Sequence, residues 1–153
     1  MKKLLLSLAA MTAFTTVSAQ KLLVLYYSET GTTKTVAQEM QKQLGADIEA
    51  IECVKPYSGN FQETIQRGQR EMQSGEYPAL KPLTKKIADY DVIFLGYPIW
   101  FGTYANPIVT LLKEQDFAGK TVVPLCTFGS GGLNTSSEAL KKALAKAKIQ
   151  TGY

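Results

Sequence analysis

The sequence reads Lys21-Leu22-Leu23-Val24-Leu25-Tyr26-Tyr27 and then, without a break, Ser28-Glu29-Thr30-Gly31-Thr32-Thr33. The first part is a mostly apolar run that predicts a buried strand, and the pattern of residues 33–44 predicts an amphipathic helix. A hydroxyl-rich turn at this junction can bind phosphate, because the first N–H groups of a helix are free and its dipole attracts anions. The turn contains no Lys or Arg, which favours a phosphate monoester held by neutral donors.

The rest of the chain alternates between strand-like and helix-like patterns. After the strand at residues 21–27, we predict strands at residues 47–53, 91–96 and 121–127, helices at 61–72, 104–114 and 136–147, and a short helical turn at 83–88. Such alternation is typical of an α/β fold, a doubly wound parallel sheet with helices on both faces. The sequence stops soon after the last predicted helix, so we expect the fifth strand to be missing or truncated and the helix after it to be absent.

Three predicted loops leave the carboxyl ends of apolar strands, which is where an open parallel sheet binds its ligands. The first is the hydroxyl turn. The second, residues 97–102, reads Tyr-Pro-Ile-Trp-Phe-Gly and offers flat aromatic surface. The third, residues 127–132, reads Thr-Phe-Gly-Ser-Gly-Gly, and its glycines let the backbone approach a ring closely. Together the loops suit a ligand that combines a phosphate with a planar heterocycle.

Each loop has a simpler explanation when it is taken alone. Hydroxyl residues are common helix N-caps, a single tryptophan such as Trp100 is often a core residue, and Gly-rich stretches are often only flexible loops. The expected convergence of all three loops at one end of one sheet favours the ligand site over these explanations.

Through these motifs, residues 20–153 resemble the flavodoxin family. The turn at residues 28–33 is similar to the family's Ser/Thr-x-Thr-Gly-x-Thr loop, which holds the phosphate of FMN. The other two loops fall at the positions that contact the isoalloxazine ring. The resemblance implies a three-layer flavodoxin-like domain with strand order 2-1-3-4 and a fifth strand at the edge.

The same resemblance implies that FMN is the cofactor and which residues bind it. The hydroxyls and amides of the turn, at residues 28 and 30–33, would hold the phosphate. Trp100 would stack on the isoalloxazine, and backbone groups of residues 127–129 and 132 would face the pyrimidine edge. The implied cofactor-binding residues are Ser28, Glu29, Thr30, Gly31, Thr32, Thr33, Pro98, Ile99, Trp100, Phe101, Gly102, Thr127, Phe128, Gly129 and Gly132.

The function implied by the resemblance is electron transfer, with a redox partner protein or a small electron acceptor as the partner. No catalytic side chain is expected, because the flavin carries the redox chemistry. An NAD(P)H-dependent FMN or quinone oxidoreductase is an alternative. A second alternative is a cofactor-free binding module of the cell envelope.

Composition excludes several other kinds of site. The 153 residues contain no histidine, so neither a histidine-based zinc site nor a Ser-His triad can form, and no metal is expected. The two cysteines, Cys53 and Cys126, lie in or beside predicted strands and are expected to be buried free thiols. No basic run is interleaved with aromatic residues, so we expect no nucleic-acid partner.

The first 19 residues have the features of an export signal. Met1-Lys2-Lys3 is followed by an apolar run up to Phe14 and by small residues that end at Ala19. The apolar run is too short for a membrane span, so we expect cleavage after Ala19, no stable membrane insertion afterwards, and a periplasmic or secreted domain of residues 20–153. Loss of Lys2 and Lys3 lowers the formal net charge from +4 to +2.

Overall fold

The computed structural model describes residues 18–152. The predicted export signal falls almost wholly outside the described residues, because residues 1–17 are not among them. In the described part of the chain, no helix is long and apolar enough to span a membrane.

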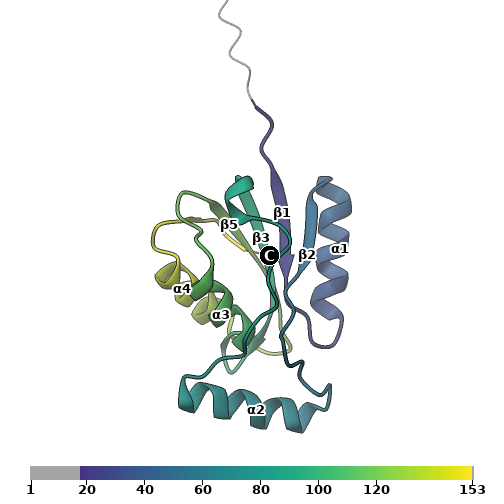
Figure 1. Ribbon diagram of the computed structural model, residues 1–153, viewed down its shortest axis with the longest axis vertical. Coiled ribbons are helices and arrows are strands. Elements are labelled where there is room, and N and C mark those ends of the chain that lie inside the picture. The colour runs from purple at the N-terminus through teal and green to yellow at the C-terminus, as the bar shows by residue number, and fades with distance from the viewer. Residues whose placement is uncertain (1–17, 153) are drawn as a thin grey trace, which may run out of the picture.

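A parallel sheet forms the centre of the molecule, with strand order β2-β1-β3-β5-β6 (Figure 1). Its strands are β1 (Leu22–Tyr26), β2 (Asp47–Ala50), β3 (Val92–Trp100), β5 (Thr121–Thr127) and β6 (Lys148–Ile149). A short strand, β4 (Thr103–Tyr104), pairs with β3 in the antiparallel direction. The α/β fold and the strand order predicted from the sequence are confirmed.

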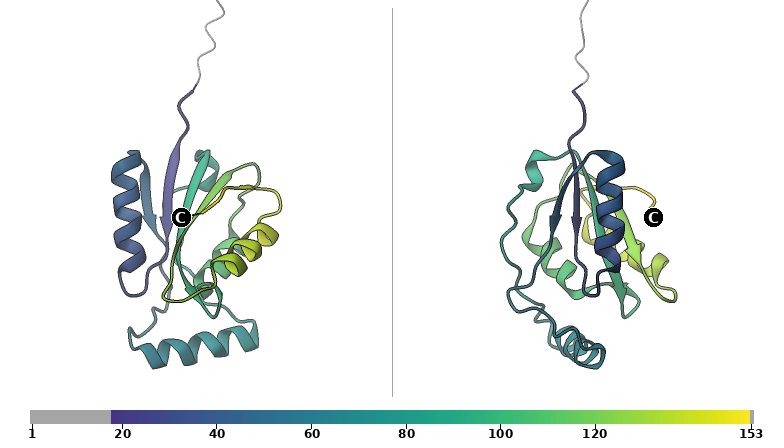
Figure 2. Two further views of the ribbon diagram at one scale, coloured as in Figure 1. Left: turned by 180° about the vertical axis from the view of Figure 1, so that it is seen from behind. Right: turned by 90° about the vertical axis from the view of Figure 1, so that its right-hand side faces the viewer.

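The helices complete a three-layer arrangement. Helix α1 (Thr32–Leu44) covers one face of the sheet, while α3 (Asn106–Glu114) and α4 (Leu133–Ala143) cover the other (Figure 2). Helix α2 (Phe61–Ser74) belongs to neither layer and lies across the carboxyl ends of the strands (Figure 1). A 3₁₀ turn at Ile87–Asp89 precedes β3 where a short helical turn was predicted.

Two apolar clusters hold these layers together, one on each face of the sheet. The larger contains Leu23, Leu25 and Ile93 from the strands, packed with residues of α3 and α4. The smaller contains Val24, and Ala37 of α1 packs there. Because successive side chains of a strand point to opposite faces, the continuous apolar run of β1 serves both clusters.

The second predicted loop is largely part of a β-hairpin. Strand β3 continues to Trp100, which pairs with Thr103 of β4. The two residues between them, Phe101 and Gly102, have positive φ values of 51° and 79°. Positive φ at both central residues is favoured in two-residue hairpin turns, because it matches the twist of the flanking strands. The sequence prediction ended this strand at Gly96, and that was wrong because the aromatic run pairs with residues beyond the turn.

Two helices also begin elsewhere than predicted. Helix α4 begins at Leu133 rather than at residue 136, because Gly132 takes a positive φ of 90° at its N-cap. Helix α3 begins at Asn106 rather than at residue 104, because Tyr104 belongs to β4 and pairs with Ile99 of β3. The predicted strand at residues 47–53 ends at Ala50.

The fifth strand was expected to be missing or truncated, and the structure contains a two-residue strand in its place. The β6 residue Ile149 pairs with Val122, whose carbonyl accepts a hydrogen bond from the Gln150 N–H at 3.0 Å. Pro124 lies two residues after Val122, so its backbone also faces the β6 side of β5, but a proline has no N–H to donate there. The ladder between β5 and β6 therefore stops, while the pairing of β5 with β3 continues through Pro124.

Candidate functional site

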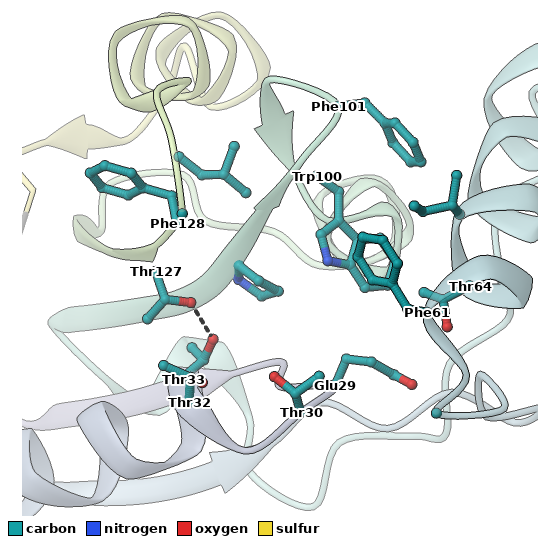
Figure 3. A pocket seen from close by; sticks show the side chains of 15 residues that line it. Glu29, Thr30, Thr32, Thr33, Phe61, Thr64, Trp100, Phe101, Thr127 and Phe128 are labelled. Carbon is teal, nitrogen blue, oxygen red and sulfur yellow. Dashed lines mark hydrogen bonds between the residues drawn. The ribbon is translucent and has the colours of Figure 1, made fainter.

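A cavity of about 620 Å³ lies at the carboxyl ends of β1, β3 and β5, the size of a small-molecule site (Figure 3). It is lined by the hydroxyl turn, the aromatic end of β3, the loop after β5 and the start of α2. The lining residues are Glu29, Thr30, Thr32, Thr33, Gly59, Phe61, Thr64, Ile65, Pro98, Ile99, Trp100, Phe101, Thr127, Phe128 and Gly129.

The hydroxyl turn leaves the start of α1 free to bind an anion. Ser28 Oγ accepts a hydrogen bond from the Gly31 N–H at 3.1 Å, which closes the turn. Gly31 is the N-cap residue with φ 94°, and no side chain caps the helix. The first N–H groups of α1 therefore lack intrahelical partners beside the cavity, where the helix dipole is positive.

A close approach of α1 to the sheet positions this turn. A Cβ at Gly96 would lie 2.9 Å from Tyr26 Cβ and 3.4 Å from Thr33 Cγ2, so the glycine makes room for the start of the helix. Thr33 is 2% exposed and its hydroxyl lies 2.7 Å from the hydroxyl of Thr127. This bond joins the first and third predicted loops, as Figure 3 shows.

Trp100 lies in the aromatic wall of the same cavity. Its ring stands edge-on to Tyr27, with centroids 5.8 Å apart, and to Tyr57, with centroids 5.1 Å apart. The tryptophan is half-buried, so one part is held by these tyrosines while another lines the cavity. The sequence prediction placed Trp100 near the hydroxyl turn, and the structure brings both to one cavity.

Three exposed phenyl rings also line the cavity. Phe61, Phe101 and Phe128 are 74%, 42% and 49% exposed, and they come from α2, the β3–β4 turn and the loop after β5. Among the exposed large hydrophobic residues of the described range 18–152, these three are the aromatic ones. Such a concentration of exposed apolar surface is typical of a binding site.

The cavity lining carries one charged side chain, that of Glu29, and no Lys or Arg. Glu29 Oε2 accepts a hydrogen bond from the Tyr27 hydroxyl at 2.6 Å. Burial, and then this bond, raise the pKa of Tyr27, so the tyrosine keeps its proton and the carboxylate keeps its donor. Glu29 was predicted as a cofactor-binding residue, and the structure places it in the cavity lining with its side chain bonded to Tyr27.

Four predicted site residues shape the cavity rather than line it. Ser28 and Gly31 build the hydroxyl turn, and Gly102 supplies the positive φ of the hairpin. At Gly132, a Cβ would lie 2.7 Å from Ile99 Cγ2 and 3.3 Å from the Gly102 Cα. The glycine therefore lets the start of α4 pack directly against the β3–β4 hairpin.

The sequence prediction missed the wall formed by Gly59, Phe61, Thr64 and Ile65. These residues surround the N-terminus of α2, where Asn60 Oδ1 accepts a hydrogen bond from the Glu63 N–H at 3.1 Å. The hydroxyl of Thr64 is buried without a hydrogen-bond partner. The available signal was apolar Phe61 immediately after this cap, with apolar Ile65 one turn later.

The described residues contain no cluster of His, Cys, Asp or Glu that could hold a metal ion. Cys53 and Cys126 are free thiols, the first buried and the second half-buried. Burial raises the pKa of the Cys53 thiol to about 11, and burial also raises that of Cys126. Both thiols stay protonated at neutral pH, so neither offers a reactive thiolate.

The profile of the flavodoxin family matches residues 21–153. A candidate flavoprotein from Bacteroides eggerthii is 33% identical, with a TM-score of 0.80 over 88% of this chain and 87% of the other. One from Bacteroides uniformis is 31% identical, with a TM-score of 0.79 over 88% of each chain. A Lactobacillus acidophilus flavoprotein in complex with FMN shares the fold at 21% identity, with a TM-score of 0.79 over 88% of this chain and 92% of the other.

No curated protein matches. On the profile match and the shared fold, the chain belongs to the flavodoxin family.

Proposed function

We propose that this protein binds FMN in the described cavity and uses it to transfer electrons. The observation that carries the proposal is that one cavity joins the uncapped start of α1 to the half-buried ring of Trp100. The first suits a phosphate and the second suits a planar ring. The FMN complex of the Lactobacillus acidophilus protein, which has the same fold, supports the choice of ligand.

The donor set of this cavity fits the phosphate of FMN. Thr30, Thr32 and Thr33 line the cavity beside the free N–H groups of α1, so neutral donors and the helix dipole face the anion. In this proposal Ser28 and Gly31 hold the turn in shape. The Glu29 side chain stays with Tyr27, and only its backbone is available to the phosphate.

The remaining walls fit a flat heterocycle. Trp100 and Ile99 of β3 offer apolar surface for its faces, and the backbone of Thr127, Phe128 and Gly129 offers polar groups for its edge. The buried hydroxyl of Thr64, which has no protein partner, is a further polar group on the α2 side. FMN supplies one- and two-electron redox chemistry when bound, so this chain needs no acid–base side chain of its own.

We place an electron carrier ahead of an NAD(P)H-dependent enzyme, because no second nucleotide site is evident among the residues that line the cavity. The exposed rings of Phe61 and Phe128 instead form an open apolar rim, through which a partner protein or a small acceptor can approach the ring site.

Titration of FMN-free protein with FMN tests the proposal. We expect quenching of flavin fluorescence at micromolar protein, and weaker binding of riboflavin, which lacks the phosphate. Folded protein that leaves FMN fluorescence unquenched would contradict the proposal and favour the cofactor-free binding module. Anaerobic addition of NADPH then separates the two redox functions, because only an NAD(P)H-dependent enzyme should bleach its bound flavin without a partner.

We also propose that the chain is exported, on the basis of the pattern of residues 1–19. Expression of the full sequence followed by cell fractionation tests this. A mature N-terminus at Gln20 in the exported fraction supports export. Retention of Met1 in the cytoplasmic fraction contradicts it.

A further inference from the structure

A buried carboxylate lies behind the aromatic wall of the cavity. Glu71 of α2 is 9% exposed, and it is the one charged residue that is buried within residues 18–152. Its Oε2 accepts hydrogen bonds from the Tyr57 hydroxyl at 2.5 Å and from Asn106 Nδ2 at 2.8 Å. Its Oε1 accepts one from Arg67 Nε at 2.7 Å. The carboxylate therefore joins three segments of the chain.

Each donor has a second contact that ties α2 to the body of the protein. Asn106, the first residue of α3, also donates to the Gly68 carbonyl of α2 at 3.0 Å. Arg67 donates to the Pro56 carbonyl at 2.9 Å, and its guanidinium lies 3.9 Å from the centroid of the Tyr57 ring. The network thus holds α2, the start of α3 and the segment before α2 in one arrangement.

Tyr57 connects this network to the cavity. Its ring packs edge-on against Trp100 at an interplanar angle of 83°. Its hydroxyl points to Glu71, and burial followed by that bond raises its pKa. Loss of the Glu71 carboxylate would therefore affect the packing of Trp100 through the Tyr57 ring, which contacts both residues.

Helix α2 has few other attachments. Its buried residues are Gly68 and Glu71 alone, so no apolar stripe packs it against the sheet. The Phe101 ring also lies against the helix, because a Cβ at Gly68 would lie 2.8 Å from Phe101 Cε2. Since Phe61, Thr64 and Ile65 line the cavity from α2, the position of the helix sets the position of that wall.

We propose that Glu71 is a positioning residue for the cavity, which orients Trp100 through Tyr57 and fixes the α2 wall through Asn106 and Arg67. The carboxylate does not line the cavity and does not contact its ligand. The consequence for ligand affinity rests on the proposed binding of FMN, whereas the consequence for Trp100 does not.

The first experiment uses the FMN-free protein, because Trp100 is the single tryptophan of the 153 residues. We expect Glu71→Gln to shift tryptophan emission to the red and to increase its quenching by acrylamide, while circular dichroism and cooperative urea unfolding show that the fold is kept. The matched control is Glu52→Gln, which removes a carboxylate 2.6 Å from Lys81 Nζ in an exposed ion pair that does not line the cavity. The control should leave tryptophan emission unchanged.

The second experiment measures FMN binding to the same variants. We expect Glu71→Gln to raise the FMN dissociation constant about tenfold and to alter the visible flavin spectrum, because a misplaced wall weakens a preorganised site. Wild-type protein that binds no FMN contradicts the proposed function, and the tryptophan measurement then still decides the role of Glu71.

A third variant keeps the proposal testable if Glu71→Gln does not fold. Tyr57→Phe keeps the ring beside Trp100 and removes only the hydroxyl that donates to Glu71. We expect a smaller change of tryptophan quenching in the same direction. Unchanged Trp100 emission and quenching in the folded variants would overturn the proposal.

Discussion

In residues 18–152, three tyrosine hydroxyls each donate to a carboxylate. The pairs are Tyr27 with Glu29, Tyr57 with Glu71 and Tyr90 with Asp47. The first two tyrosines also pack edge-on against Trp100. They therefore satisfy two carboxylates near the cavity and orient its aromatic wall, because one end of a tyrosine is polar while its ring is apolar.

The hydroxyl pair of Thr33 and Thr127 provides a prediction at the scale of one bond. Thr127→Val leaves the buried Thr33 hydroxyl without its partner, so we expect the free energy of unfolding to fall by about 1–3 kcal/mol. Urea unfolding measures the change. Thr127→Ser keeps the hydroxyl and should lose less. Equal stability of the valine variant and the wild type would show that the bond contributes nothing.

A second residue-scale prediction concerns Gly132. Gly132→Ala places a Cβ 2.7 Å from Ile99 Cγ2 at a φ of 90°, so we expect a loss of about 1–3 kcal/mol of stability from strain and overpacking. Thermal and urea unfolding measure it. The control is Gly129→Ala in the same loop, where a Cβ meets nothing within 4 Å. A loss at position 129 as large as that at 132 would contradict the explanation.

At the scale of elements, α1 and α2 differ in how they begin. Helix α1 has no side-chain cap and leaves its first N–H groups beside the cavity, whereas the side chain of Asn60 caps α2. An uncapped helix start is less stable but available to an anion. The helix that faces the proposed phosphate is thus the one that lacks a cap, while the helix that supports the wall has one.

The cap of α2 can be tested directly. Asn60→Ala removes the acceptor of the Glu63 N–H, so we expect about 1 kcal/mol of lost stability and weaker FMN binding through displacement of Phe61 and Thr64. Calorimetry and FMN titration measure the two effects. Asn134→Ala, at an exposed position within α4, is the control and should change neither. A cap variant with full stability would show that the bond is not needed.

At the scale of the whole molecule, many phenol and thiol groups are buried in protonated form. Burial, and then the bond to Asp47, raise the pKa of Tyr90 to about 12, and burial raises that of Cys53 to about 11. Burial also raises the pKa of Tyr27, Tyr57 and Tyr97. The folded state therefore keeps protons that the unfolded chain releases at lower pH.

We therefore predict that the free energy of unfolding falls at alkaline pH. The contribution of these groups is complete below their unfolded pKa values of 9.0 for cysteine and 10.0 for tyrosine, and it is lost as pH rises through the folded values of about 11 for Cys53 and about 12 for Tyr90. Urea unfolding between neutral pH and about pH 11 measures this. Tyr90→Phe should flatten the decline at its alkaline end. Constant stability over that range would contradict the prediction.

Much of the fold was predictable because its signals are local. Apolar runs such as Leu22–Tyr26 and the helical period of Thr32–Leu44 are read from neighbouring residues, and their alternation restricts the topology. The three loops of the candidate site were also predictable, because parallel strands bring their carboxyl ends to one edge. The hairpin at Phe101 and the early start of α4 were not, since each depends on contacts with residues beyond the local window.

Residue order alone predicted an α/β sheet and a hydroxyl-rich turn at the start of its first helix, because periodicity and turn composition are properties of consecutive residues. Contacts across the fold decided where α2 lies, that its residue Glu71 is buried, and which tyrosines hold Trp100. Glu71 and Asn106 are 35 positions apart. No local pattern relates two such residues, because their hydrogen bond forms only when separate helices have already packed.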